Sequence, residues 1–113
     1  MRSYLIDELQ PEVLDRLEAA LTAQGCQSGI ERLYWLTLDD DLLLPVQREH
    51  ATSCGPHCLA LERLDDGVRL EFLGRAKGRM RCECVSYPTP EAERRMMERL
   101  DALVAEAEKA TLQ

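Results

Sequence analysis

The residues with the clearest capacity for chemistry in this sequence are two histidines and four of its five cysteines. Cysteine and histidine are ligands that zinc prefers, and cysteine thiolates also carry out redox chemistry. The candidate metal ligands are His50, Cys54, His57, Cys58, Cys82 and Cys84. We expect a zinc site with the four cysteines as first-choice ligands and with either histidine able to replace one of them.

The spacing of these residues supports a shared site. His50 and Cys54 are four apart, which places both on one face of a helix, and Cys82 and Cys84 are two apart, which places both on one face of a strand. Four thiolates would carry a formal double negative charge, which favours a set that includes a neutral histidine. The objection is distance, because Cys58 is expected two strands away from Cys82, or roughly 10 Å.

Two other interpretations of the cysteines stay open. They can be small buried hydrophobic residues beside exposed histidines, or they can serve a small thiol or redox enzyme that uses Cys54 or Cys58. Cys54-Gly-Pro-His-Cys58 resembles the Cys-Gly-Pro-Cys active site of thioredoxins over these five residues alone. It differs in its longer cysteine spacing and in following a helix, whose C-terminal dipole disfavours a thiolate. We therefore lean against an enzyme.

Composition narrows the class of protein. The 113 residues are 45% hydrophobic, which suits one domain spanning residues 1–113. A net charge of -7 has the wrong sign for binding nucleic acid or an anionic membrane. No apolar run reaches membrane-spanning length, and Met1 leads into Asp7 and Glu8 rather than into an apolar leader. We expect a cytoplasmic protein, where disulfides are rare.

The N-terminal half contains signals for two helices and two strands. Apolar residues recur at helical spacing from Pro11 to Gln24, and Gly25 suits the position after a helix end. Segments 2–6 and 30–38 have strand character, the first more weakly. Pro45 is placed to open a short helix running to about Cys54, with Gly55 as the left-handed residue that ends it.

The C-terminal half predicts a three-stranded antiparallel meander over 58–65, 68–75 and 79–87. A two-residue turn at Asp66-Gly67 pairs residues 65 and 68, and a second at Lys77-Gly78 pairs 76 and 79. These pairings put one apolar set on the core face, namely Leu59, Leu61, Val68, Leu70, Phe72, Val85 and Tyr87. Thr89 is a suitable N-cap for a long helix from Pro90 to about Ala110.

Together these elements predict an α+β fold, with a mostly antiparallel sheet packed against the first and last helices. The last helix has a wide apolar face, built on Met96, Leu100, Leu103 and Ala107 with Met97 and Val104 beside it. Methionines are common on partner-binding surfaces, so we expect a homodimer or a protein partner at this helix. The sequence thus favours a small binding or regulatory module acting through protein interaction, with a structural zinc site as its candidate cofactor.

Overall fold

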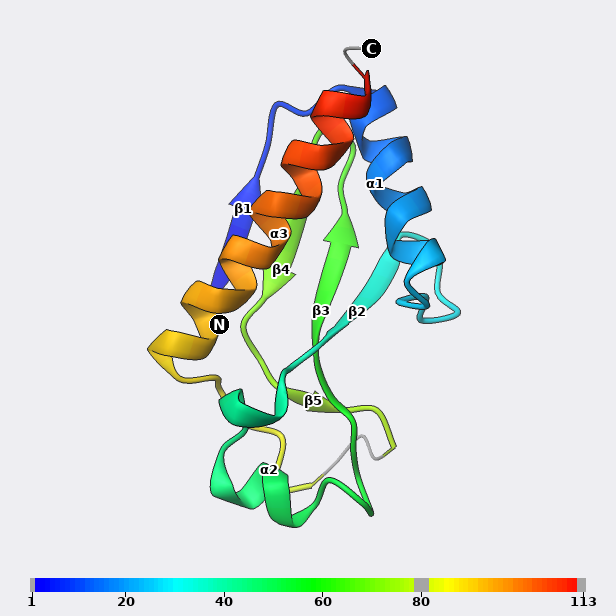
Figure 1. The fold of residues 1–113 in the computed structure, drawn as a ribbon. Coiled ribbons are helices and arrows are strands. Elements are labelled where there is room, and N and C mark those ends of the chain that lie inside the picture. The colour runs from blue at the N-terminus through cyan, green and yellow to red at the C-terminus, as the bar shows by residue number, and fades with distance from the viewer. Residues whose placement is uncertain (1, 79–81, 112–113) are drawn as a thin grey trace.

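The computed structural model describes residues 2–78 and 82–111 and shows an antiparallel sheet with helices packed against it (Figure 1). The elements are β1 Ser3–Ile6, α1 Pro11–Ala23, β2 Leu33–Thr37, the 3-10 helix η1 Asp40–Leu42, α2 Pro45–Glu49, β3 His57–Arg63, β4 Val68–Glu71, β5 Arg75–Ala76 and α3 Pro90–Thr111. This arrangement confirms the predicted α+β class, the first strand, and the long helices at both ends.

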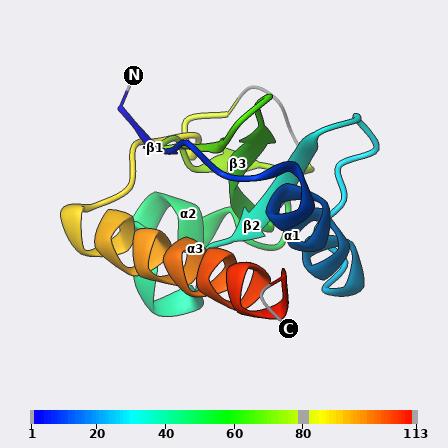
Figure 2. The same cartoon turned by 90° about the horizontal axis from the view of Figure 1, so that it is seen from above.

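The sheet has the strand order β1-β4-β3-β2, and every neighbouring pair is antiparallel. The two-residue strand β5 lies off this path and pairs with the start of β3, where Cys58 faces Arg75. Helices α1 and α3 lie side by side on one face of the sheet (Figure 2). The opposite face of the sheet is therefore not covered by these two long helices.

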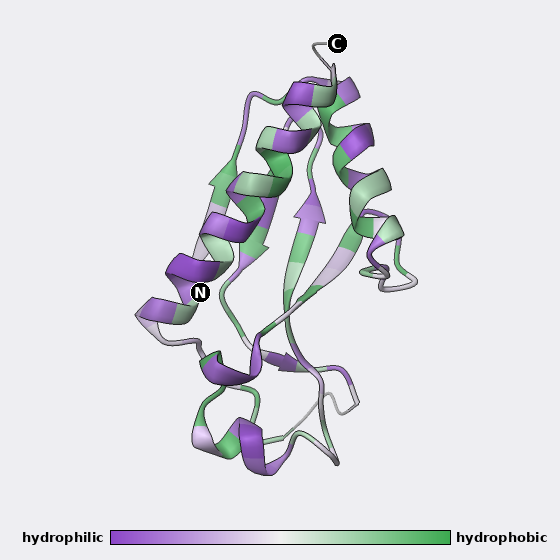
Figure 3. Cartoon of the chain, in the orientation of Figure 1, coloured by the Kyte–Doolittle hydropathy of each residue, from purple (hydrophilic) through white to green (hydrophobic). Residues whose placement is uncertain are grey.

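The core fills the space between the sheet and the two long helices. Green apolar bands alternate with purple polar bands along α3, as its amphipathic pattern requires (Figure 3). The predicted core face of the meander is confirmed for β3 and β4, because Leu59, Leu61, Val68, Leu70 and Phe72 are all buried. They pack with α1 and α3 residues that are almost fully buried, including Leu14, Leu17, Leu21, Met96 and Leu100.

The first meander turn is longer than predicted. Arg63, rather than Asp65, pairs with Val68, and the Leu64 N–H donates a hydrogen bond to the Gly67 carbonyl. The register is therefore displaced by an even number of residues. Such a shift leaves every side chain on its predicted face, which is why the core assignment survives.

The predicted third strand at 79–87 is wrong in its described part, and residues 79–81 lie outside the described residues. Residues 82–85 form a turn in which the Val85 N–H donates to the Cys82 carbonyl, and Ser86 makes an isolated bridge with Gly74. Tyr87, predicted on the core face, is 64% exposed. The alternating side chains of this segment suit a strand, but the backbone hydrogen bonds of the turn replace the ladder.

Helix ends follow the sequence signals at α1 and α3 but not at α2. Gly25 has φ 75°, and the Thr89 hydroxyl accepts a hydrogen bond from the Ala92 N–H at 3.1 Å, both as predicted. Helix α2 ends at Glu49, five residues earlier than predicted, and Gly55 has no left-handed φ. Gly55 is required for space, because a Cβ there would lie 2.4 Å from the Ala51 carbonyl oxygen.

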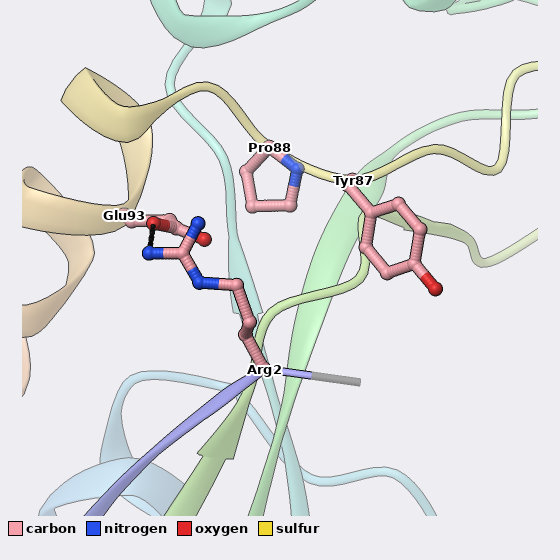
Figure 4. A pocket seen from close by; sticks show the side chains of 4 residues that line it. All are labelled: Arg2, Tyr87, Pro88 and Glu93. Atoms are coloured by element: carbon pink, nitrogen blue, oxygen red, sulfur yellow. Dashed lines mark ion pairs between the residues drawn. The ribbon is translucent and has the colours of Figure 1, made fainter.

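The N-terminal end of the described chain is tied to the start of α3. Arg2 Nη2 lies 2.8 Å from the Glu93 carboxylate beside Pro88 and Tyr87 (Figure 4). The Glu93 side chain is buried, so this ion pair balances a charge that would otherwise be desolvated alone. No helix among the described residues is long and apolar enough to cross a membrane.

Candidate metal centre

The residues of interest gather in a small lobe at the end of the molecule that carries α2 and β5 (Figure 1). We call residues 45–56, 75–78 and 82–87 the cysteine lobe. Its hydrophobic cluster is separate from the main core and contains buried Cys54, Ala76 and Cys84, with Val46, Cys82 and Val85 partly buried against them. Three of these six side chains are thiols, so the apolar area available to hold the lobe together is small.

Four metal-ligating side chains meet inside the cysteine lobe. The ligand atoms of His50, Cys54, Cys82 and Cys84 all lie within 4.8 Å of one another. His50 Nδ1 is 3.2 Å from the Cys82 sulfur and 3.6 Å from the Cys54 sulfur, and these two sulfurs are 3.6 Å apart. The sulfur separation is far longer than the roughly 2.05 Å of a disulfide bond.

These separations match the edges of a tetrahedral zinc site. With Zn–S bonds of about 2.3 Å and Zn–N bonds of about 2.0 Å, tetrahedral angles place two sulfurs about 3.8 Å apart and a sulfur about 3.5 Å from a nitrogen. The distances between the ligand atoms of His50, Cys54 and Cys82 lie within about 0.3 Å of those values. Small side-chain movements would therefore bring these three ligands onto one ion, and the Cys84 sulfur lies within 4.8 Å of each of them.

The backbone presents the two pairs of ligands from two turns. The Cys54 N–H donates to the His50 carbonyl at 2.7 Å, which keeps both side chains on one side although α2 has already ended. The turn that begins at Cys82 brings Cys84 back toward them. Both turns have few residues, so their positions depend on contacts with the rest of the lobe.

Gln47 joins α2 to the Cys82–Cys84 turn. Its side chain is buried, its Oε1 accepts from the Leu44 N–H at 2.9 Å, and its Nε2 donates to the Cys84 carbonyl at 3.3 Å. Gly74 leaves room for it, because a Cβ at that position would lie 2.7 Å from Gln47 Nε2. Gln47 thus positions the Cys84 turn against α2.

Glu83 lies on the outer side of His50. The Glu83 carboxylate is 3.5 Å from His50 Nε2, while Nδ1 faces the sulfurs. The hydrogen bond with Cys54 is the main cause that raises the pKa of His50, and the negative charge of Glu83 adds to it. A carboxylate behind a ligating imidazole fixes the ring orientation and its tautomer, as in many zinc sites.

Burial determines the protonation of the Cys84 thiol. Desolvation raises the pKa of Cys84 to about 12, and the neighbouring Cys82 and Cys54 thiols raise it further in the same direction. Without a cation the Cys84 thiol is therefore protonated at neutral pH, and a bound divalent ion would have to displace this proton. Cys84 is therefore suited to binding a cation rather than to presenting a reactive thiolate.

The structure brings four of the six predicted ligands together and leaves two outside the group. Cys58 is fully buried on β3, its sulfur 3.6 Å from the Thr37 hydroxyl, and burial raises its pKa. His57 precedes Cys58 on β3, so its side chain lies on the opposite face of that strand. It is 2% exposed, and neither ring nitrogen has a hydrogen-bond partner among the described residues. His50 is therefore the fourth ligand of the group, in place of Cys58, which the sequence analysis gave as a first-choice ligand.

Sequence reasoning missed the two supporting residues. Gln47 is a polar residue that becomes buried between predicted elements, and nothing in its local pattern marks it. Glu83 stands between two candidate ligands in Cys-Glu-Cys, which was the available signal for a carboxylate near the site. No protein-family model, curated protein or solved structure matches this chain, so its function has to be inferred from the geometry of the site.

Proposed function

We propose that this protein is a small zinc-binding module in which Cys54, Cys82, Cys84 and His50 hold one zinc ion. The observation that carries the proposal is the convergence of these four ligand atoms within 4.8 Å. Three thiolates and one imidazole suit zinc in tetrahedral geometry, whereas calcium and magnesium prefer oxygen ligands. Four protein ligands fill the coordination shell, so the ion is structural and has no open position for catalysis.

The proposed role of the ion is to stabilise the cysteine lobe. The lobe has a short helix, a two-residue strand and a small hydrophobic cluster, which together bury little apolar area. Its segments are joined by a few backbone hydrogen bonds, including Lys77 N–H to the Pro56 carbonyl and Gly78 N–H to the Cys54 carbonyl. Zinc bound to residues from two of these segments would supply the missing stabilisation.

The module is proposed to act through protein interaction, in the cytoplasm, where a reducing environment keeps neighbouring thiols available as ligands. Its net charge of -7 disfavours nucleic acid as a partner. The interaction surface is proposed on α3. This chain itself buries Met96, Leu100, Val104 and Ala107, which leaves the half-buried Met97 and Leu103 as the apolar residues for a homodimer or protein partner.

The alternative of a thiol enzyme has less support. A nucleophilic cysteine needs a lowered pKa and access to substrate. Cys54 and Cys58, the two candidate nucleophiles, are both fully buried, and burial raises the pKa of Cys58. Neither thiol is accessible to a substrate.

Metal content tests the zinc proposal directly. Protein purified without chelator and without a metal-affinity tag is expected to contain one equivalent of zinc, and cobalt substitution is expected to give the visible absorption of a tetrahedral thiolate site. Cys84→Ser should lose both signals, whereas the control Cys26→Ser, which changes a cysteine of the main core, should keep them. Less than about 0.1 equivalent of metal in the parent protein would refute the proposal.

A further inference from the structure

The sheet face opposite α1 and α3 carries a hollow of about 550 Å³. Its floor includes Trp35 of β2 and Ala60 of β3, which are direct cross-strand partners. Ile30, at its border, is 65% exposed although it is a large apolar residue. The volume lies within the range of roughly 300–1,000 Å³ that is typical of small-molecule sites.

The hollow exists because small side chains stand beside a large aromatic one. Among the described residues that line the hollow, Ala60 and Ala76 are alanines, and both are buried. A larger residue at position 60 would fill the space next to the Trp35 ring. The result is a flat aromatic wall with open volume beside it, which suits a planar or extended apolar group.

The charges around the hollow favour an anion. Glu71 and Arg75 neutralise each other in an ion pair of 2.7 Å. Lys77 also lines the hollow and is exposed, and it makes no ion pair with any residue in the described part of the chain. The described lining therefore carries one uncompensated positive charge on a protein whose net charge is -7.

We propose that this hollow binds a small amphipathic anion, with a flat apolar body against Trp35 and a single carboxylate, sulfonate or phosphate group toward Lys77. No proposed zinc ligand is among the described lining residues, although Arg75, Ala76 and Lys77 belong to the cysteine lobe. Apolar contact provides most of the affinity, and the lysine selects the sign of the head group.

Trp35 makes the test specific, because it is the single tryptophan of the chain. The protein as purified is titrated with anilinonaphthalene sulfonate while Trp35 emission is followed. The neutral phenylnaphthylamine, which has the same aromatic body without the sulfonate, is titrated in parallel. We expect saturable quenching at one dye per chain, with weaker binding of the neutral dye.

Three variants assign the binding to this hollow. Lys77→Gln is expected to weaken sulfonate binding about fivefold and to leave the neutral dye unaffected. The matched control Lys109→Gln removes an equal charge from the exposed end of α3 and is expected to change neither affinity. Ala60→Leu fills the hollow and is expected to abolish binding of both dyes, with near-UV circular dichroism showing that the fold is retained.

Several results would overturn the inference. These are the absence of saturable quenching, equal weakening by Lys77→Gln and Lys109→Gln, or full binding by a folded Ala60→Leu variant. A shift of Trp35 emission with protein concentration alone would show that a second copy of the chain occupies the hollow, and would also overturn it. If Ala60→Leu does not fold, the comparison of the two lysine variants decides.

Discussion

His50 Nδ1 lies 3.2 Å from the Cys82 sulfur, although the two residues are 32 positions apart in the sequence. An imidazole nitrogen and a thiol this close, with two more thiols beside them, form a site that a divalent cation would hold together. The relationship also defines what the ion would do. It would link the turn after α2 to the Cys82–Cys84 turn, which Gln47 also joins to α2 through the Cys84 carbonyl.

Removal of the metal is expected to destabilise the protein. A structural ion that binds only the folded state contributes about 4 kcal/mol at a thousand times its dissociation constant, which corresponds to roughly 15–30 °C in Tm for a domain of this size. Chelator treatment should lower Tm by at least about 10 °C in calorimetry. Restoring zinc should reverse the change, and Cys84→Ser should show the low Tm with or without chelator. A Tm unaffected by chelator would contradict the structural role.

Glu83 is expected to tune zinc affinity without being a ligand. Its carboxylate lies 3.5 Å from His50 Nε2, and removal of such a partner typically costs about 10- to 100-fold in metal affinity. The Glu83 side chain is well exposed, so we expect the lower end, about tenfold, for Glu83→Gln in competition with a coloured chelator. Glu98→Gln on the exposed side of α3 is the charge-matched control. Equal affinities in both variants would show that Glu83 does not position His50.

Much of the fold could be predicted because the apolar residues of the long elements recur at helical or alternating spacing. Leu14, Leu17 and Leu21 mark α1, and the alternation from Leu59 to Phe72 assigns the core face even with the turn misplaced. The position of the Cys82–Cys84 turn could not be predicted. It depends on distant contacts, such as Gln47 to the Cys84 carbonyl, and local alternation gives no sign of them.

This difference explains the partial success at the candidate metal centre. His50 and Cys54 are four residues apart, and the turn after α2 keeps the helix-like hydrogen bond between them. The pair could therefore be predicted from the local sequence. Cys58 was expected to join them because it follows closely in sequence. Instead, Cys58 pairs with Thr37 of β2 and lies on the sheet face opposite α1 and α3. This position is set by long-range strand pairing.

Tyr34 makes the stability of the folded protein depend on pH in the alkaline range. Burial, together with the hydrogen bond from its hydroxyl to Glu18, raises the pKa of Tyr34 from 10.0 to about 12. The folded state thus binds this proton more tightly than the unfolded state. The resulting stabilisation is fully present below pH 10 and is lost as the pH rises toward 12.

Denaturant unfolding at pH values between 9 and 12 would test this effect. The parent protein is expected to lose stability across that window more steeply than Tyr34→Phe, which has no hydroxyl to ionise. Tyr87→Phe, at a residue that is 64% exposed, should follow the parent. Parallel curves for the parent protein and Tyr34→Phe would rule out the proposed contribution of Tyr34.

The last prediction concerns assembly through α3. Met96 is 1% exposed and packs in the core, whereas Met97 is half-buried at the edge of the same apolar stripe. If Met97 and Leu103 form a homodimer contact, light scattering at high micromolar concentration should show a dimer, and Met97 should be protected from peroxide. Met97→Glu should then give a monomer, while Ala102→Glu, at an exposed position on the same helix, serves as the control for one added negative charge. A monomer at every concentration, with Met97 oxidised and Met96 protected, would exclude the homodimer and restrict the proposed surface to a different protein.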